Sequence, residues 1–168
     1  MTHVVLSLGS NIESDKNIRF AVREIQKRFG VLEISPVYET TSVGFDGPPF
    51  LNLVVGFYSD QGLLAVRDSV REVEAIAGRI RGRKAFDNRV LDIDVILFGE
   101  TDFSPEFNIP RDEIHKYAYV LKPLCDLYPE GLHPVLKESY CDMWGNFNQG
   151  DQLLKQVEMT FKQPGVSD

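Results

Sequence analysis

Cysteine is scarce in this sequence, and this limits the classes of protein that it can encode. The 168 residues include only two cysteines, Cys125 and Cys141. Two are too few for a disulfide scaffold, and their separation does not match a C-x-x-C metal or redox motif. We therefore expect both side chains to be structural thiols in a reducing compartment.

Long apolar runs and an excess of positive charge are also absent. No apolar stretch reaches the ~20 residues that cross a membrane, and the first residues, MTHVVLSLGSN, lack the charged and apolar regions of a signal peptide. The 25 acidic residues outnumber the 18 basic ones, and the net charge is −7. We therefore expect a soluble cytoplasmic protein that binds neither nucleic acid nor membrane.

Repeats and low-complexity tracts are missing too, and the composition is that of an ordinary globular domain. Hydrophobic residues make up 43% of the chain and charged residues 26%, so disorder is not indicated. A chain of this length fits one domain with a single core. We predict that residues 1–168 form one domain, monomeric, with a flexible tail at 163–168.

The chain is organised around the segment from Arg89 to Gly99, RVLDIDVILFG. It is mainly apolar and rich in β-branched residues, so it predicts a buried strand. Its two acidic residues, Asp92 and Asp94, are two positions apart and should point to the same face of that strand. Two carboxylates so placed repel each other and lose hydration, and a bound cation would remove both problems. Such hard oxygen ligands suit magnesium carried on phosphates.

The residues before this strand are basic, against the overall sign of the chain. They include Arg79, Arg81, Arg83, Lys84 and Arg89, with Asp87 as the one acidic residue among them. Guanidinium groups bind phosphate oxygens in a forked geometry, so the combination predicts metal-assisted transfer of a phosphate group. The alternative is that Asp92 and Asp94 line a solvated sheet face beside an exposed loop. The adjacent basic residues favour the site over this alternative.

Hydrophobic periodicity predicts an α+β fold. We expect strands at 4–8, 31–38, 50–58 and 89–99, a helix at 15–29, and a second helix that follows a cap at Ser59 or Asp60 and extends to Ala77. The order is the ferredoxin-like βαββαβ core, an antiparallel sheet with both helices on one face. In the C-terminal extension we expect an edge strand at 101–108, a turn or short helix at 110–116, a helix at 119–127 and an amphipathic helix at 152–161.

Several residues have two interpretations. Asn52, in an otherwise apolar strand, either hydrogen-bonds the edge of a heterocycle or satisfies neighbouring backbone. Phe86, in a charged loop, either stacks on a flat ligand or folds back onto the core. Glu74 is by default a solvated charge and Tyr119 a core residue. Residues 9–11, Gly-Ser-Asn, either form a plain turn or bring backbone N–H groups close to a ligand, and the turn is the commoner case.

Taken together, the chain resembles the family of 6-hydroxymethyl-7,8-dihydropterin pyrophosphokinases (HPPK). The matching motifs lie in order between Val4 and Tyr128: SLGSN at 7–11, YET at 38–40, FLN at 50–52, VEAIAGRIR at 73–81 and RVLDIDVILFG at 89–99. The last motif is the most specific. The family has a ferredoxin-like core, which agrees with the order of elements inferred from the residues.

The resemblance implies that ATP donates its β,γ-pyrophosphate to the hydroxymethyl group of the pterin and that AMP is released. It implies two magnesium ions that bridge the triphosphate, with Asp92 and Asp94 as the matching metal ligands. Arg79 and Arg89 match the family's catalytic arginines, which stabilise charge during transfer. The residues that the resemblance assigns to ATP are Glu74, Arg79, Arg81, Arg89 and Arg111.

The resemblance also implies a pterin site. Thr40 and Asn52 match residues that hydrogen-bond the pterin, and Phe86 and Tyr119 match the aromatic pair that sandwiches its ring. Val43 and Phe50 belong to the same set. The loops at 41–49 and 82–88 resemble lids that close to exclude water.

The sequence departs from the family pattern on the nucleotide side. The family's Gly-Pro-type pair before Arg89 is Asp-Asn here, its His after a proline is Arg111, and its following Arg is Tyr117. A basic position near Glu106 has become acidic. Arg111 can bind phosphate as a cation but cannot shuttle protons as His does. The pterin-side and metal-side residues are kept.

Two other functions stay open at this point. One is a diverged, non-catalytic module that holds pterin or nucleotide for regulation. The other is a metal-dependent nucleotidyl or phosphoryl transferase with a different acceptor. Assaying the nucleotide product and the acceptor separates both of them from a pyrophosphokinase.

Overall fold

The structure is a computed structural model and describes residues 1–41, 46–78 and 90–163. In its N-terminal part, up to β5, the strands and helices follow one another in the predicted order. The core elements are β1 (Thr2–Ser10), α1 (Ser14–Phe29), β2 (Glu33–Ile34), β3 (Val37–Thr40), β4 (Phe50–Ser59), α2 (Leu63–Ile76) and β5 (Asp92–Phe98). The extension contains α3 (Glu113–Lys116), α4 (Ala118–Leu127), α5 (Tyr140–Gly145) and β6 (Lys155–Val157).

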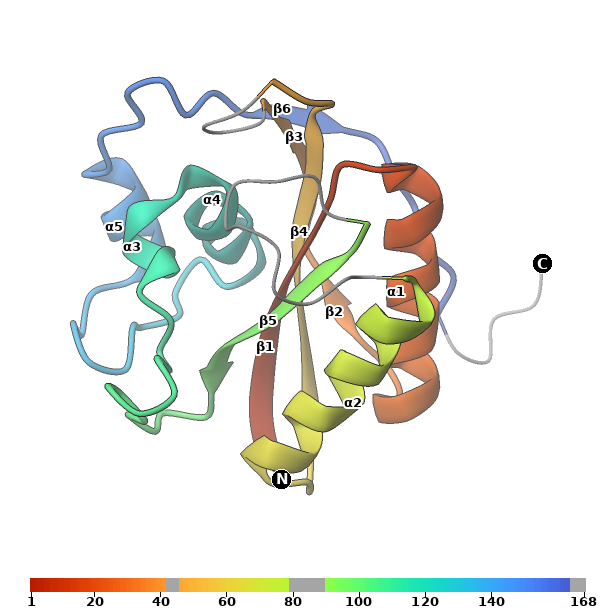
Figure 1. Ribbon diagram of the computed structural model, residues 1–168. Helices are drawn as coiled ribbons and strands as arrows, with labels where there is room; N and C mark the ends of the chain where they lie inside the picture. The colour runs from red at the N-terminus through yellow and green to blue at the C-terminus, as the bar shows by residue number, and fades with distance from the viewer. Residues whose placement is uncertain (42–45, 79–89, 164–168) are drawn as a thin grey trace.

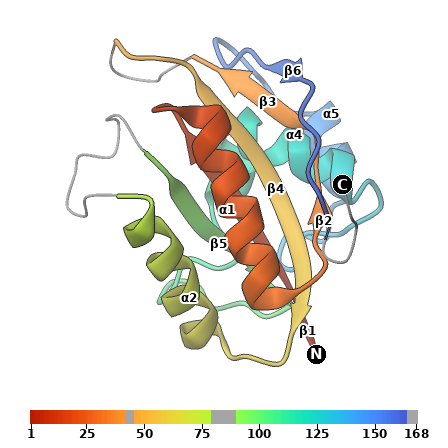
Figure 2. The same cartoon turned by 90° about the vertical axis from the view of Figure 1, so that its right-hand side faces the viewer.

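One antiparallel sheet organises the described chain. Its strand order is β5-β1-β4-β3-β6, and β2 pairs with β4 beside this path. Figures 1 and 2 show α1 and α2 together on one face of the sheet and α4 and α5 on the other. The prediction of a ferredoxin-like core is confirmed, and the extension adds helices to the second face and a strand to the edge beside β3.

The side chains of α1 explain why this segment is a helix. Ile18, Ala21, Val22 and Ile25 are all buried, and their spacing of three and four places them on one face. The helix ends where Gly30 takes a φ of 87°, a left-handed conformation that a glycine adopts without steric cost. The predicted helix at 15–29 is confirmed within one residue.

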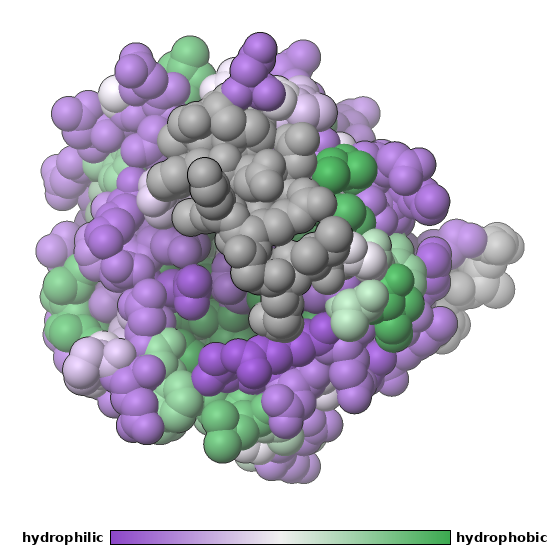
Figure 3. All heavy atoms as spheres, in the orientation of Figure 1, coloured by the Kyte–Doolittle hydropathy of each residue, from purple (hydrophilic) through white to green (hydrophobic). Residues whose placement is uncertain are grey.

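Figure 3 shows a mainly hydrophilic face on which hydrophobic residues form small separate groups. Among the helices that the structure describes, none is both long and apolar enough to cross a bilayer.

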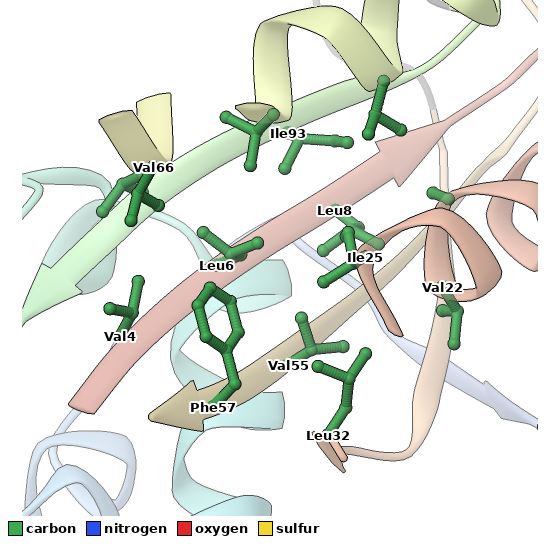
Figure 4. Close-up of a cluster of buried hydrophobic side chains, with 14 of the residues drawn as sticks. Val4, Leu6, Leu8, Val22, Ile25, Leu32, Val55, Phe57, Val66 and Ile93 are labelled. Carbon is green, nitrogen blue, oxygen red and sulfur yellow. The ribbon is translucent and has the colours of Figure 1, made fainter. Parts of the chain in front are cut away.

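The sheet separates two hydrophobic clusters. The first lies between the sheet and α1 and α2, and Figure 4 shows Leu6 of β1 and Phe57 of β4 pointing into it. The second lies under α4 and α5 and includes Val5, Val54 and Ile96. Neighbouring residues of one strand therefore enter different clusters, as the period of two requires.

Three predicted boundaries within the core are wrong. The turn expected at 9–11 begins later, because β1 continues through Gly9 to Ser10. The strand expected at 31–38 is split into β2 and β3 at Ser35-Pro36, where the Ser35 hydroxyl accepts a hydrogen bond from the backbone N–H of Val54. Proline has no N–H with which to continue the ladder. The predicted cap of α2 is also displaced, because the helix begins after Gly62 and Ser59 instead accepts a bond from the backbone N–H of Gln61.

The C-terminal extension differs more from the predictions. Residues 101–108 form an irregular segment with a turn at 104–107 rather than an edge strand, and the cis Ser104-Pro105 peptide lies in this turn. The expected helix at 152–161 is an extended segment that contains β6. Its apolar residues are two positions apart, which is the period of a strand. They are Val157, Met159 and Phe161, and they pack on the first cluster. Short helices α3 and α4 match their predictions, whereas α5 was not foreseen.

The two cysteines are joined in the structure. Cys125 on α4 and Cys141 on α5 form a disulfide, with their Cα atoms 4.8 Å apart. The prediction of two free thiols is therefore wrong, since the packing of α4 on α5 brings distant positions together. The cysteines consequently give no support for a reducing compartment.

We predict that Leu6→Ala lowers the free energy of unfolding by about 3 kcal/mol, because the side chain is fully buried on an interior strand, β1, and its loss leaves a cavity. Urea unfolding followed by circular dichroism measures the change. The control is Leu64→Ala, which removes the same atoms from a side chain that is 61% exposed. Equal losses in both variants would contradict the burial that the structure assigns.

Candidate functional site

A row of residues crosses the sheet at the end of β1. Gly9 pairs with Asp92 of β5 on one side and with Asn52 of β4 on the other, and Asn52 pairs with Tyr38 of β3. Residues directly opposite one another in a sheet point to the same face. This face is the one that α4 covers, because the Tyr38 hydroxyl donates a hydrogen bond to Asp126 of that helix.

The two acidic residues of β5 lie on this face. Asp92 and Asp94 are partly exposed, while Ile93 between them is buried in the opposite cluster. Burial, and after it the charge of Asp92, raises the pKa of the Asp94 carboxyl; Arg111 offsets part of this, and the net pKa is about 7. The pair therefore sits where additional positive charge would stabilise it.

Arg111 supplies one positive charge to this pair. Its Nη2 lies 3.6 Å from Asp94 Oδ1 and 3.3 Å from Glu113 Oε1. Burial lowers the pKa of Arg111, but the charges of Asp94 and Glu113 outweigh burial and the net shift is upward. Its backbone N–H donates to the carbonyl of Ile96, which ties the start of this segment to β5.

Two tyrosines lie beside the acidic residues. The rings of Tyr117 and Tyr119 stack with their centroids 5.1 Å apart. Burial raises the pKa of the Tyr119 hydroxyl, and the negative charge of Glu113 contributes. Tyr119 is half-buried against the second cluster, so the prediction of a core residue holds for part of its surface only.

The pterin-side residues form a second group. Asn52 is 3% exposed, and its amide donates to Thr40 Oγ1 at 3.0 Å and to the carbonyl of Tyr38 at 3.4 Å. A Cβ at Gly9 would lie 3.2 Å from Asn52 Oδ1 and 3.9 Å from the ring of Phe50. Glycine therefore lets the Asn52 amide approach the backbone of β1 closely, whereas the contact with Phe50 would be an ordinary one.

Glu74 holds the strand that carries the aspartates. It is 2% exposed, and its Oε2 accepts a hydrogen bond of 2.9 Å from the backbone N–H of Ile93. The default interpretation of a solvated charge is wrong, because α2 packs on β5 and turns this side chain inward. A charged acceptor at this place fixes the backbone midway between Asp92 and Asp94.

Ser10 holds the segment that leads into β5. Its hydroxyl is buried and donates to the carbonyls of Ile12 and Val90. Glu113 was not predicted to lie in a site, whereas residues 9–11 were expected mainly as a turn and Tyr117 as a changed family position on the nucleotide side. For Gly9 the available signal was a glycine at the end of an apolar strand, which marks a close approach of the backbone.

Several predicted site residues lie outside the described part of the chain. They are Val43, Arg79, Arg81, Phe86 and Arg89. The structure brings together Asp92, Asp94 and Arg111 with Tyr119 nearby, and it groups Thr40, Phe50 and Asn52.

The carboxylates fit a metal that is held mainly by another ligand. Within residues 1–41, 46–78 and 90–163, the structure contains no group of three side chains suited to bind a metal by themselves. Magnesium is commonly bound through one or two carboxylates, with waters and substrate phosphates completing its octahedron. Asp92 and Asp94 offer these two carboxylates from one face.

The fold and site point to a class, the ferredoxin-like enzymes that transfer phosphate groups. The family model of 7,8-dihydro-6-hydroxymethylpterin-pyrophosphokinase (HPPK) matches residues 5–129, and the chain belongs to this family. The predicted resemblance is confirmed, and with it the prediction of a pyrophosphokinase of folate synthesis at the level of the family.

Individual relatives agree with this assignment. The chain is 31% identical over 132 residues to the 2-amino-4-hydroxy-6-hydroxymethyldihydropteridine pyrophosphokinase of Pseudomonas aeruginosa, covering 76% of this chain and 81% of that protein. It is 31% identical over 134 residues to the folic acid synthesis protein fol1 of Schizosaccharomyces pombe, covering 77% of this chain and 18% of that protein.

A solved structure supports the fold. The HPPK-DHPS of Plasmodium falciparum superposes with a TM-score of 0.68 at 14% identity, covering 86% of this chain and 44% of the other. The present chain therefore spans less than half of this longer protein and of the fungal relative.

We predict that Asp94→Asn stabilises the metal-free protein at pH 8 by about 2 kcal/mol and has little effect near pH 4. The folded-state pKa of Asp94 is raised above the unfolded value of 3.8 to about 7. The wild type therefore loses stability as the pH rises between these two values, because ionisation then costs more in the folded state. The asparagine variant does not have this loss.

Urea unfolding of both proteins at several pH values, in a buffer with a chelator, measures this difference. Asp60→Asn is the matched control, since the Asp60 side chain is 79% exposed. A difference between wild type and Asp94→Asn that stays constant from pH 4 to pH 8 would argue against the raised pKa.

Proposed function

We propose that the protein transfers the β,γ-pyrophosphate of ATP to the hydroxymethyl group of 6-hydroxymethyl-7,8-dihydropterin. The hydroxyl oxygen forms a bond to the β-phosphorus while the bond from that phosphorus to the oxygen of AMP breaks, and AMP leaves. Family membership supports the reaction. The site supports it because acidic, cationic and amide groups lie on one face of the sheet.

The observation that carries the proposal is the row from Asp92 through Gly9 to Asn52. Neighbouring strands are about 4.8 Å apart, so the backbones at Asp92 and Asn52 are separated by about 10 Å. A bicyclic heterocycle bound at Asn52 can extend its hydroxymethyl arm across Gly9 toward the aspartates. The acceptor oxygen and the triphosphate would then meet next to β5.

On the metal side, Asp92 and Asp94 would hold magnesium, with two ions as the family resemblance implies. When bound, the ions neutralise the triphosphate and orient it for in-line displacement. Asp94 and Asp92 contribute the anionic oxygens, and Glu74 keeps the intervening backbone in place through Ile93. One edge of β5 pairs with β1, and the backbone N–H of Ile93 bonds to the Glu74 side chain. The two carboxylates therefore keep a fixed spacing.

On the phosphate side, we assign contacts with ATP to Glu74, Arg79, Arg81, Arg89 and Arg111. Arg79 and Arg89 would stabilise the charge that moves onto the phosphate oxygens, as guanidinium groups do in phosphoryl transfer. Arg111 lies beside Asp94 and is close enough to the proposed metal ligand to reach the same phosphates.

On the pterin side, we assign Thr40, Val43, Phe50, Asn52, Phe86 and Tyr119. The Asn52 amide is already oriented by Thr40 and by the Tyr38 carbonyl, so little freedom is lost when a heterocycle binds. Tyr119 is stacked on Tyr117, which gives the ring a fixed plane on which a flat ligand can pack.

Three other statements remain predictions. They are the single domain spanning residues 1–168, the monomeric state, and the location in the cytoplasm. The proposed flexible tail lies outside the described residues from 164 onward.

We predict that the wild type forms AMP from ATP in the presence of magnesium and the hydroxymethyl dihydropterin, and that Asp94→Ala lowers the rate at least 100-fold. The substitution removes one of the two carboxylates that would position the metal and the triphosphate. Chromatographic separation of AMP and ADP measures the product. Asp60→Ala serves as control because the Asp60 side chain is exposed and lies beside the N-terminal amine of Met1.

Formation of ADP alone would replace the proposal with an ordinary phosphoryl transferase. Tight binding of pterin and nucleotide without any turnover would replace it with a non-catalytic module. A normal rate for Asp94→Ala would reject the metal assignment but leave the overall reaction in place.

We predict that Asn52→Leu raises the KM for the pterin about tenfold or more while the KM for ATP changes little. Leucine keeps the approximate size but loses the donor and acceptor that a heterocycle edge needs. Steady-state kinetics with each substrate varied in turn separates the two constants. A parallel rise in both would indicate that Asn52 acts only through the structure of the sheet.

A further inference from the structure

The guanidinium of Arg111 lies between two carboxylates of the candidate site. Nη2 is 3.6 Å from Asp94 on β5 and 3.3 Å from Glu113 at the start of α3. The side chains of Arg111 and Asp94 are 28% and 25% exposed, so water screens this pair less than it screens a surface ion pair.

The backbone fixes the position from which this side chain extends. The N–H of Arg111 donates to the carbonyl of Ile96 at 2.9 Å, two residues beyond Asp94 on the same strand. The arginine is therefore anchored to the strand whose carboxylate it faces, and it does not need a ligand to arrive there. In the absence of a ligand, Arg111 already compensates the charge of the predicted metal ligand.

A divalent cation and a guanidinium compete for the same carboxylate. Both are attracted by Asp94 and they repel each other, so a metal ion that binds here must share Asp94 with Arg111 or displace it. Phosphate oxygens resolve the competition, because they accept the forked hydrogen bonds of a guanidinium and bind the metal at the same time.

We propose that Arg111 is a counter-ion of the metal site. Its guanidinium pairs with Asp94 when no metal is bound, and it moves from Asp94 to the phosphates when a nucleotide binds. The inference rests on the proposed metal-dependent transfer and adds an order to it. Metal alone binds weakly, metal and nucleotide strengthen each other's binding, and Arg111 carries much of this coupling.

Arg111 also has hydrogen-bonding capacity that the present contacts do not use. Among the residues that the structure describes, its Nε is buried and has no hydrogen-bond partner. A phosphate that engaged both Nε and a terminal nitrogen would satisfy this donor, which Asp94 and Glu113 do not do through Nη2. The move toward phosphate is therefore favourable for the arginine as well as for the metal.

The test measures binding of Mn²⁺ alone to the nucleotide-free protein by electron paramagnetic resonance, which detects the free ion. We expect Arg111→Gln to bind Mn²⁺ about tenfold more tightly than the wild type. Arg111→Lys keeps the charge and should stay within about threefold of the wild type. Lys116→Gln is the matched control, because it removes one positive charge from the same segment but one that pairs with Asp112.

A second measurement follows the nucleotide. Calorimetry with a non-hydrolysable ATP analogue, at saturating Mn²⁺, should show about tenfold weaker binding to Arg111→Gln and unchanged binding to Lys116→Gln. Opposite changes in metal and nucleotide affinity are the signature of an exchanged counter-ion. A residue with only a structural role would weaken both.

Equal Mn²⁺ affinity in the wild type and Arg111→Gln would reject the proposed role of Arg111 as a counter-ion, but it would not contradict the proposed function. If Asp94→Asn bound Mn²⁺ as tightly as the wild type, the metal would lie elsewhere, and both the counter-ion and the metal assignment would fail. Thermal unfolding of each variant checks that the fold is retained.

Discussion

The repulsion between two carboxylates on one face of an edge strand is the constraint on which the site depends. Asp92 and Asp94 are held together because their strand is buried on its other side through Ile93, so neither can turn away without exposing the core. Burial first, and the charge of Asp92 second, raise the pKa of Asp94. Arg111 supplies positive charge that offsets part of this rise, and under the proposed function a metal carried on phosphates would supply more.

Other residues of the sheet and of α2 fix the positions of these two carboxylates. Glu74 accepts from the backbone between the aspartates, and Ser10 donates to the carbonyl of Val90, two residues before Asp92. Gly9 keeps side-chain atoms out of the interval between Asp92 and Asn52. These residues stabilise the fold and position the chemistry together, because a site built on paired strands inherits their spacing.

The errors of the sequence analysis have a common origin in contacts between distant segments. The segment at 152–161 contains polar and apolar residues that fit a helix, but the free edge of β3 offered backbone partners and the segment became extended. Cys125 and Cys141 are separated in sequence, and only the packing of α4 on α5 joins them. Glu74 was taken for a surface charge because its own helix gives no indication of the strand that it contacts.

The sequence by itself determined the order of the core elements, the common face of Asp92 and Asp94, and the family, because periodicity and local motifs are properties of neighbouring residues. Only the tertiary structure decided which residues meet across the sheet, as Gly9 does with Asp92 and Asn52. It also decided that Arg111 faces Asp94 and that Glu74 is buried. Strand register and helix packing bring these groups together, and neither is encoded in the spacing of residues along one segment.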